Sequence, residues 1–109
     1  MPSPPSILLL DHQGLLVRLT PERRLHILEH PEMRSAEAGI RQTLARPDRV
    51  VRSSSDPTVR LSYRYYPGTP VGGKHLCVVV KVVPGDAFVV TAYLTDSVKK
   101  GAVLWTAER

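Results

Sequence analysis

The sequence predicts an α+β fold in which two N-terminal helices pack on an antiparallel sheet of four or so strands. Helix signals are confined to residues 20–46, whereas residues 47–105 consist mainly of short runs in which polar and apolar residues alternate. A chain of 109 residues is long enough for one domain with a single core. Residues 1–6 are expected to form a flexible tail and residues 7–109 the domain.

The N-terminal part of the domain combines a short extended region with the first helix. Two apolar runs, SILLLDH and LLVRLT, lie on either side of residues 13–14 and predict either a hairpin or one bent edge strand. The segment TPE at residues 20–22 predicts a helix start, because a hydroxyl cap, a first-turn proline and an acid suit the positive end of a helix. The helix should end near residues 30–31, where a proline follows a histidine. Its buried side is expected to consist of Leu25, Ile27 and Leu28.

A second helix and several strands are expected to follow. The segment SAEAGIRQTLAR predicts a helix capped by Ser35 and ending before Pro47. Its inward side is expected to consist of Ala36, Ile40 and Leu44. Beyond it, DRVVRSS predicts a short strand, TVRLSYRYY a longer strand and PGTPVGGK an irregular loop. The final run, AVLW, has two interpretations, an edge strand or the packing of Trp105 on the core.

The centre of the predicted sheet is a hairpin of two valine-rich runs joined by a turn at residues 84–86. Because side chains alternate across a strand, each run has two faces. One face is expected to lie under the helices, and it consists of Leu76, Val78, Val80, Val82, Phe88, Val90, Ala92 and Leu94. The polar sides of the three long strands are expected to form one surface on the other side, made up of Arg60, Ser62, Arg64, His75, Lys81, Thr91 and Tyr93.

This predicted polar face contains four potential cations and no carboxylate. Antiparallel sheets are ordinarily polar on their exposed side, but solvated strands usually mix the two signs of charge. Cations, hydroxyls and a phenol suit a phosphodiester, with Arg and Lys on phosphate and Tyr stacked on a base. The net charge of +5 also favours a polyanionic partner.

Other residues restrict the class of protein. The single cysteine, Cys77, excludes an internal disulfide and a cysteine metal cluster, and it suits a reducing cytoplasm. No apolar run approaches the ~20 residues of a membrane-spanning helix, so a cytoplasmic protein with no membrane partner is expected. His26 and His30 are four residues apart, a metal-chelating spacing, but no third ligand is evident and neither a metal nor another cofactor is expected. Helix-end capping and acid–base chemistry both remain open for these histidines.

Several segments, taken in order over residues 15–105, resemble a known group of nucleases. These segments are LTPERRLHILEHPEM, GIRQTLARPDRVVRS, VRLSYRYYP, HLCVVVKVV and FVVTAYLTDSVKKG. They resemble the phage-barnase, EndoU, colicin and RelE-like families that share the BECR fold. The resemblance implies a BECR-like domain and metal-independent RNA cleavage, as found in toxins and in phage-related proteins. It also implies that the candidate catalytic residues are His30, Arg64, Lys81, Thr91 and Tyr93. The chain departs from the pattern at Glu29, where a basic residue is expected.

The function expected from the sequence is therefore a small endoribonuclease of the toxin type. The ribose 2′-hydroxyl would attack the adjacent phosphorus, with His30 as general acid or base and cations stabilising the phosphoryl oxygens. Further RNA contacts are expected from Arg23, His26, Arg60, Lys99 and Lys100. Two alternatives remain open. One is an RNA-binding module without catalysis, and the other is an interaction protein whose polar sheet face docks a partner such as a cognate antitoxin or immunity protein.

Overall fold

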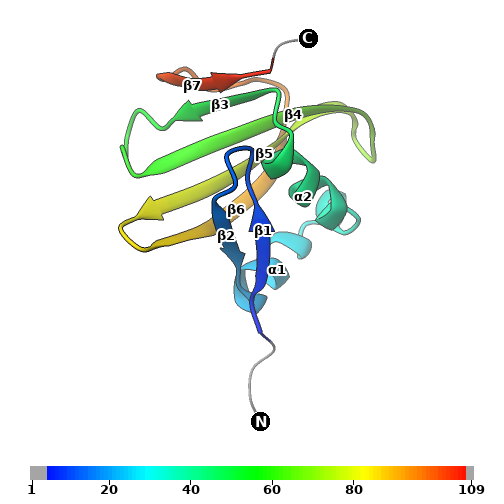
Figure 1. Cartoon of the computed structure of the whole chain (residues 1–109). Coiled ribbons are helices and arrows are strands. Elements are labelled where there is room, and N and C mark those ends of the chain that lie inside the picture. The colour runs from blue at the N-terminus through cyan, green and yellow to red at the C-terminus, as the bar shows by residue number, and fades with distance from the viewer. Residues whose placement is uncertain (1–4, 108–109) are drawn as a thin grey trace.

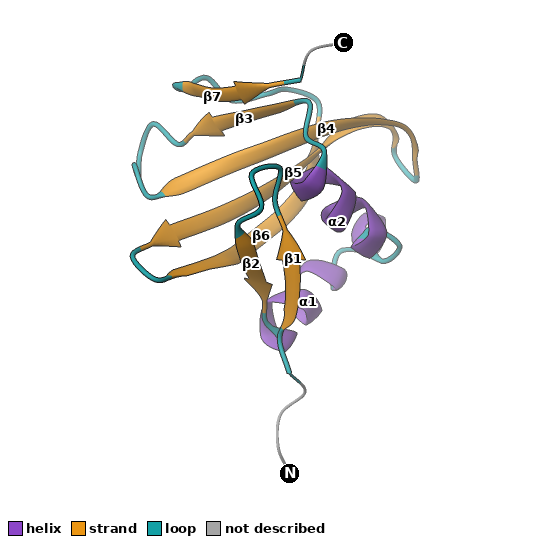
Figure 2. Cartoon of the chain, in the orientation of Figure 1, coloured by secondary structure: helices purple, strands orange, loops and turns teal. Residues whose placement is uncertain are grey.

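The computed structural model describes residues 5–107 as one sheet with helices packed against one of its faces (Figure 1 and Figure 2). Of the tail predicted at residues 1–6, residues 1–4 lie outside the described part. The elements are β1 (Ile7–Leu10), β2 (Leu16–Leu19), α1 (Pro21–Leu28), the 3₁₀ helix η1 (Pro31–Met33), α2 (Glu37–Ala45), β3 (Arg49–Arg52), β4 (Val59–Thr69), β5 (Gly72–Val83), β6 (Asp86–Thr95) and β7 (Val103–Thr106).

These strands form a seven-stranded mixed sheet in the order β1-β2-β6-β5-β4-β3-β7. The prediction of four or so antiparallel strands is therefore wrong. The short runs near both ends of the chain all join the sheet, and β2 pairs with β6 in parallel through Arg18 and Phe88. Alternation indicates that a segment is extended, but it does not indicate which other segment will pair with it.

The two hairpin turns of the long strands differ in how well they were predicted. PGTPVGGK was expected to be an irregular loop, but β4 continues to Thr69 and β5 begins at Gly72. Gly72 has a φ of +92°, which glycine adopts without a Cβ clash, and the Thr69 hydroxyl donates a hydrogen bond to its carbonyl oxygen. The turn at residues 84–85 lies where it was predicted, and Gly85 has a φ of +76°.

Helix α1 begins as predicted but buries less than predicted. The Thr20 hydroxyl accepts a hydrogen bond from the Arg23 backbone N–H at 3.2 Å, which caps the helix. Ile27 is buried, whereas Leu25 has 63% of its surface exposed. The apolar side of this short helix is therefore narrower than the sequence suggested.

Helix α2 has Ile40 and Leu44 buried, as predicted. It begins at Glu37 with no side-chain hydrogen bond at its cap, so the predicted capping role of Ser35 is wrong. The Glu37 carboxylate instead accepts two hydrogen bonds from the Arg24 guanidinium, at 3.0 and 2.9 Å, and this ion pair joins the two helices. At eight and nine residues, both α-helices are far shorter than the ~20 residues that span a bilayer.

The helices cover one face of the sheet, here called the helix-covered face, and the main core lies beneath them (Figure 2). On β5 this face carries Leu76, Val78 and Val80, as predicted. The register between β5 and β6 shifts beside Val80 of β5, and this shift interrupts the alternation of side chains on β6. Phe88 therefore pairs with Lys81 on the other face of the sheet, here called the open face. The expectation that Phe88 faces the helices is therefore wrong.

A connection of residues 96–102, here called the crossing segment, runs from β6 to β7 over the open face. β5, β4 and β3 lie between these two strands in the sheet (Figure 1). Val98 of the segment packs on a second, smaller core, made up of Val51, Leu61, Tyr63 and Cys77. The open face is therefore partly covered, and only the remainder is accessible.

The two ends of the sheet approach one another. His12, in the turn between β1 and β2, lies against Trp105 of β7, with ring centroids 4.9 Å apart. Since β1 and β7 are the first and last strands in the sheet order, this contact requires the sheet to curl around the helix-covered face. In Figure 1 the β1–β2 hairpin lies in front of the other strands, consistent with this curl.

Candidate functional site

The predicted polar face is divided between the two faces of the sheet. Arg60, Ser62 and Arg64 pair directly with Val80, Val78 and Leu76, which lie on the helix-covered face. Directly paired residues project to the same side of an antiparallel sheet. The three β4 residues therefore face away from Lys81, Thr91 and Tyr93. The predicted surface requires a register in which the polar residues of β4 lie beside those of β5. The actual register of these two strands differs from it by one residue.

Arg64 is consequently separated from the other predicted catalytic residues. Its guanidinium donates a hydrogen bond to the Arg46 carbonyl oxygen at the end of α2, at 2.6 Å, and lies 6.0 Å from the Tyr66 ring centre. These contacts stabilise the junction between α2 and β4. Arg64 and Lys81 therefore cannot clamp one phosphate together, because the sheet lies between the two side chains.

The predicted helical site residues lie on the helix side as well. Arg23, His26 and His30 are all exposed, and the two imidazole rings are 6.4 Å apart at their centroids. His26 Nδ1 is 4.0 Å from the Glu29 carboxylate. His30 precedes η1, which packs against β6 on the helix-covered face. The structure therefore does not bring His30 together with Lys81, Thr91 and Tyr93 as a general acid or base.

The open face does bring several of the predicted residues together. A cavity of about 360 Å³, here called the open-face pocket, lies between the sheet, the β3–β4 loop and the crossing segment. Thr91 and Tyr93 of β6 and Lys99 and Lys100 of the crossing segment all line it. Its other walls are Ser53, Ser54, Ser55, Asp56, Val59, Leu61 and Val79.

The crossing segment is fixed to the sheet on both sides of its lysines. The Lys99 backbone N–H donates a hydrogen bond to the Tyr63 hydroxyl at 3.1 Å. Further along, the Arg52 backbone N–H donates to the Ala102 carbonyl oxygen at 2.8 Å. Lys99 and Lys100 are thus held at the rim of the pocket by backbone contacts, and their side chains remain exposed.

The charge at this site is mainly positive. Lys81 Nζ lies 3.6 Å from the Asp56 carboxylate, the acidic group in the pocket wall. Hydrogen bonds from the Thr58 hydroxyl and backbone, together with the nearby Lys81 charge, lower the pKa of Asp56. Asp56 is therefore ionised near neutral pH. Its negative charge balances one of the three positive charges at this site, those of Lys81, Lys99 and Lys100.

Below the pocket, the Tyr63 and Tyr93 hydroxyls meet the buried Cys77 thiol. Burial raises the pKa of Tyr63 to about 12, and it also raises the pKa of Tyr93 and of Cys77. Both phenols and the thiol are therefore protonated near neutral pH. A protonated Tyr93 carries no charge beside the pocket, whereas a phenolate would repel an anion bound there.

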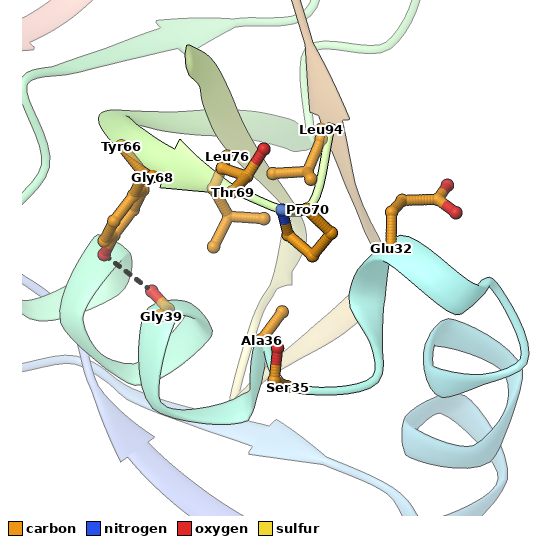
Figure 3. A pocket seen from close by; sticks show the side chains of 10 residues that line it. All are labelled: Glu32, Ser35, Ala36, Gly39, Tyr66, Gly68, Thr69, Pro70, Leu76 and Leu94. Carbon is orange, nitrogen blue, oxygen red and sulfur yellow. Dashed lines mark hydrogen bonds between the residues drawn. The ribbon is translucent and has the colours of Figure 1, made fainter. Parts of the chain in front are cut away.

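A second cavity, of about 180 Å³, lies on the helix side (Figure 3). It is bounded by η1, the start of α2 and the β4–β5 hairpin, with Leu76 and Leu94 contributing apolar walls. Tyr66 donates a hydrogen bond to the Gly39 carbonyl oxygen at 3.2 Å across one side (Figure 3). Glu32 is the charged residue of its lining, so this cavity does not suit a phosphodiester.

Comparisons of the chain with protein-family models, curated proteins and solved structures found no match. The resemblance to the BECR nucleases therefore remains a prediction. RNA cleavage and a cognate antitoxin or immunity protein likewise remain predictions.

Sequence reasoning missed the parts of the pocket that come from loops and from the apolar side of β4. Alternation predicts only a short strand, DRVVRSS, in this region, although the three successive serines before the aspartate at residues 53–56 are a dense set of hydroxyls. Alternation along β4 places Tyr63 on the side opposite Arg60, Ser62 and Arg64, and therefore opposite the predicted polar face. The pairing of Tyr63 with Cys77 was the missing information, because that register places it beneath the crossing segment.

Proposed function

We propose that this protein binds single-stranded RNA and holds a backbone phosphate in the open-face pocket. The observation that carries this proposal is the meeting of Lys99, Lys100, Thr91 and Tyr93 around one cavity. Lysine ammoniums attract phosphate, and hydroxyls fix its oxygens by hydrogen bonds. Tyr93 is half-buried and its ring can also stack on a base.

The binding energy should depend strongly on salt. For single strands, log K falls with log salt concentration by ~0.7 for each phosphate that the protein neutralises. Fluorescence anisotropy of a labelled single-stranded RNA, titrated at several salt concentrations, measures this slope. Lys99→Ala and Lys100→Ala should each weaken binding and reduce the slope by up to ~0.7.

Arg23→Ala is the matched control, because it removes one exposed positive charge from the opposite side of the sheet. It should leave the slope nearly unchanged. If Arg23→Ala weakens binding as much as Lys99→Ala does, the RNA is not bound at the open-face pocket. An affinity that does not change with salt would count against a phosphate contact altogether.

Metal-independent cleavage in the same pocket is a second candidate function. It is favoured by the position of Asp56, a carboxylate in the pocket wall beside Lys81. The Asp56 carboxylate would accept the proton of the ribose 2′-hydroxyl, and the 2′ oxygen would attack phosphorus to form a 2′,3′-cyclic phosphate. The 5′ oxygen would leave with a proton from a lysine ammonium. The lysines would stabilise the charge that develops on the phosphoryl oxygens.

This candidate transfers the role of base from His30 to Asp56, and the two can be tested separately. Cleavage by Asp56→Asn should fall by ~10²–10⁴ with RNA affinity retained, whereas His30→Ala should remain active. Products should carry a cyclic phosphate, form in excess EDTA and fail to form from a substrate with one 2′-deoxyribose at the cleavage site. If the wild type binds RNA but cuts none, the cleavage candidate fails and the binding proposal stands.

A further inference from the structure

A second group of cations lies on the helix-covered face, away from the open-face pocket. Arg52 of β3 and Arg60 of β4 are direct partners in the β3–β4 ladder, so their side chains start from neighbouring points on the same face. Both line a cavity of about 170 Å³ below the β1–β2 turn. The rest of its lining is His12, Gln13, Val50 and Leu104.

Two like charges directly opposite one another in a sheet are destabilising unless something compensates them. Within the part of the chain that the structure describes, no carboxylate lies within 4.0 Å of either guanidinium to form an ion pair. Asp11 is next to His12 in the chain, and its Oδ1 accepts hydrogen bonds from the Gln13 and Leu15 backbone N–H groups, each at 2.8 Å. The two arginines thus form a cationic pair that has no counterion among residues 5–107.

The imidazole of His12 forms part of the lining of this cavity. Its Nδ1 is buried and has no hydrogen-bond partner among the described residues. Burial is the main cause that lowers the pKa of His12; the Asp11 carboxylate opposes this change, and the Arg60 guanidinium adds to it. A neutral imidazole and the Gln13 amide can each donate a hydrogen bond to a bound oxyanion.

We propose that this cavity is a binding site for a single phosphate group, held by Arg52 and Arg60 and contacted by His12 and Gln13. Guanidinium groups match phosphate oxygens with paired N–H donors and remain charged at any physiological pH. At about 30 Å³ for each water-sized group, the cavity has room for roughly five such groups, enough for a phosphate. The phosphate is either a free ion or the terminal phosphate of an oligonucleotide. The site does not depend on the open-face pocket.

The position of Trp105 makes this proposal directly measurable. Trp105 is the only tryptophan in the chain, and its ring lies against that of His12. A phosphate bound beside His12 should therefore change the intrinsic fluorescence in a saturable way. The titration uses inorganic phosphate at constant ionic strength, with sodium chloride as the comparison. Two further arms use a trinucleotide with and without a 5′-phosphate, which separates a free ion from an RNA terminus as the source of the group.

Variants of the two arginines test the assignment. Arg52→Gln and Arg60→Gln should each weaken phosphate binding by about tenfold or more, as expected for the loss of a charge-assisted hydrogen bond. Arg49→Gln is the control, because Arg49 lies on the same strand as Arg52 but pairs with Tyr63 on the open face. It should bind phosphate as the wild type does. Circular dichroism verifies the folding of each variant, and the NMR signal of the His12 ring provides a second readout of binding.

A saturable response to inorganic phosphate, or to the 5′-phosphorylated trinucleotide alone, supports the site and identifies the source of its ligand. The proposal is overturned if neither phosphate probe changes the Trp105 or His12 signal. It is also overturned if chloride produces an equal response, or if Arg49→Gln weakens binding as much as Arg60→Gln.

Discussion

Gly101 offers a sharp test of how the crossing segment packs on the sheet. A Cβ at this position would lie 2.7 Å from Val51 Cγ1 and closer still to the Arg52 carbonyl oxygen. A backbone oxygen cannot rotate away, so Gly101→Ala should force the segment off β3. Overpacking of this kind costs ~1–3 kcal/mol, and strain in the adjacent hydrogen bond between Arg52 and Ala102 adds ~0.5–1.5 kcal/mol.

The expected loss of roughly 2–4 kcal/mol corresponds to a fall in Tm of about 10 °C or more for a domain of this size. Thermal and urea unfolding followed by circular dichroism measure it. Gly68→Ala is the matched control, since a Cβ there meets no described atom within 4 Å, and its effect should stay within about 0.5 kcal/mol. RNA affinity of Gly101→Ala should also fall at temperatures where it is folded, because Lys99 and Lys100 move with the segment. A Tm within two or so degrees of wild type would refute this packing.

Three other predictions follow from single contacts. Thr20→Ala should cost ~1 kcal/mol in the free energy of unfolding because α1 loses its cap, and Thr20→Ser should restore most of it; equal stabilities for all three proteins would contradict the cap. The Cys77 thiol should resist alkylation at mildly alkaline pH in the native protein and react fully in denaturant, because it is buried and its pKa is raised; rapid native labelling would mean that the second core is open. The hydrogen bond and charge of Arg18 lower the pKa of Asp86 below the ordinary carboxyl value of 3.8. The pair therefore stabilises the fold at pH values above 3.8. This stabilisation disappears as the pH falls through the lowered pKa of the folded state. Unfolding of wild type and Asp86→Asn, compared across acidic pH, should show a stability difference near neutral pH that vanishes at low pH; a difference that persisted there would have another cause.

The features predicted correctly from the sequence depend on neighbours in the chain. The start of α1 needs only Thr20 and Pro21, and the β5–β6 turn needs only Gly85 between two valine-rich runs. The helix-covered side of β5 could likewise be derived from alternation alone. Such signals are contained within a few residues, so no knowledge of distant pairing is required.

The features predicted wrongly depend on pairing between distant segments. Arg64 and Lys81 both lie on strands that were identified, but a one-residue difference in register placed them on opposite faces. The register shift beside Val80, where Val90 has no partner on β5, likewise placed Phe88 on the open face. No local sequence pattern indicates the pairing of β2 with β6 or the path of the crossing segment. The sequence therefore predicts Thr91, Tyr93, Lys99 and Lys100 as separate site residues, but not the open-face pocket that they line together.

The central claim is tested most directly by mapping the residues of this molecule that RNA contacts. Two-dimensional NMR of the labelled protein, titrated with a short single-stranded RNA, reports this residue by residue. The largest amide shifts should occur at Thr91, Tyr93, Lys99 and the serines of the β3–β4 loop, which line one pocket. Shifts centred on His26 and His30, with the open-face residues unmoved, would contradict the account.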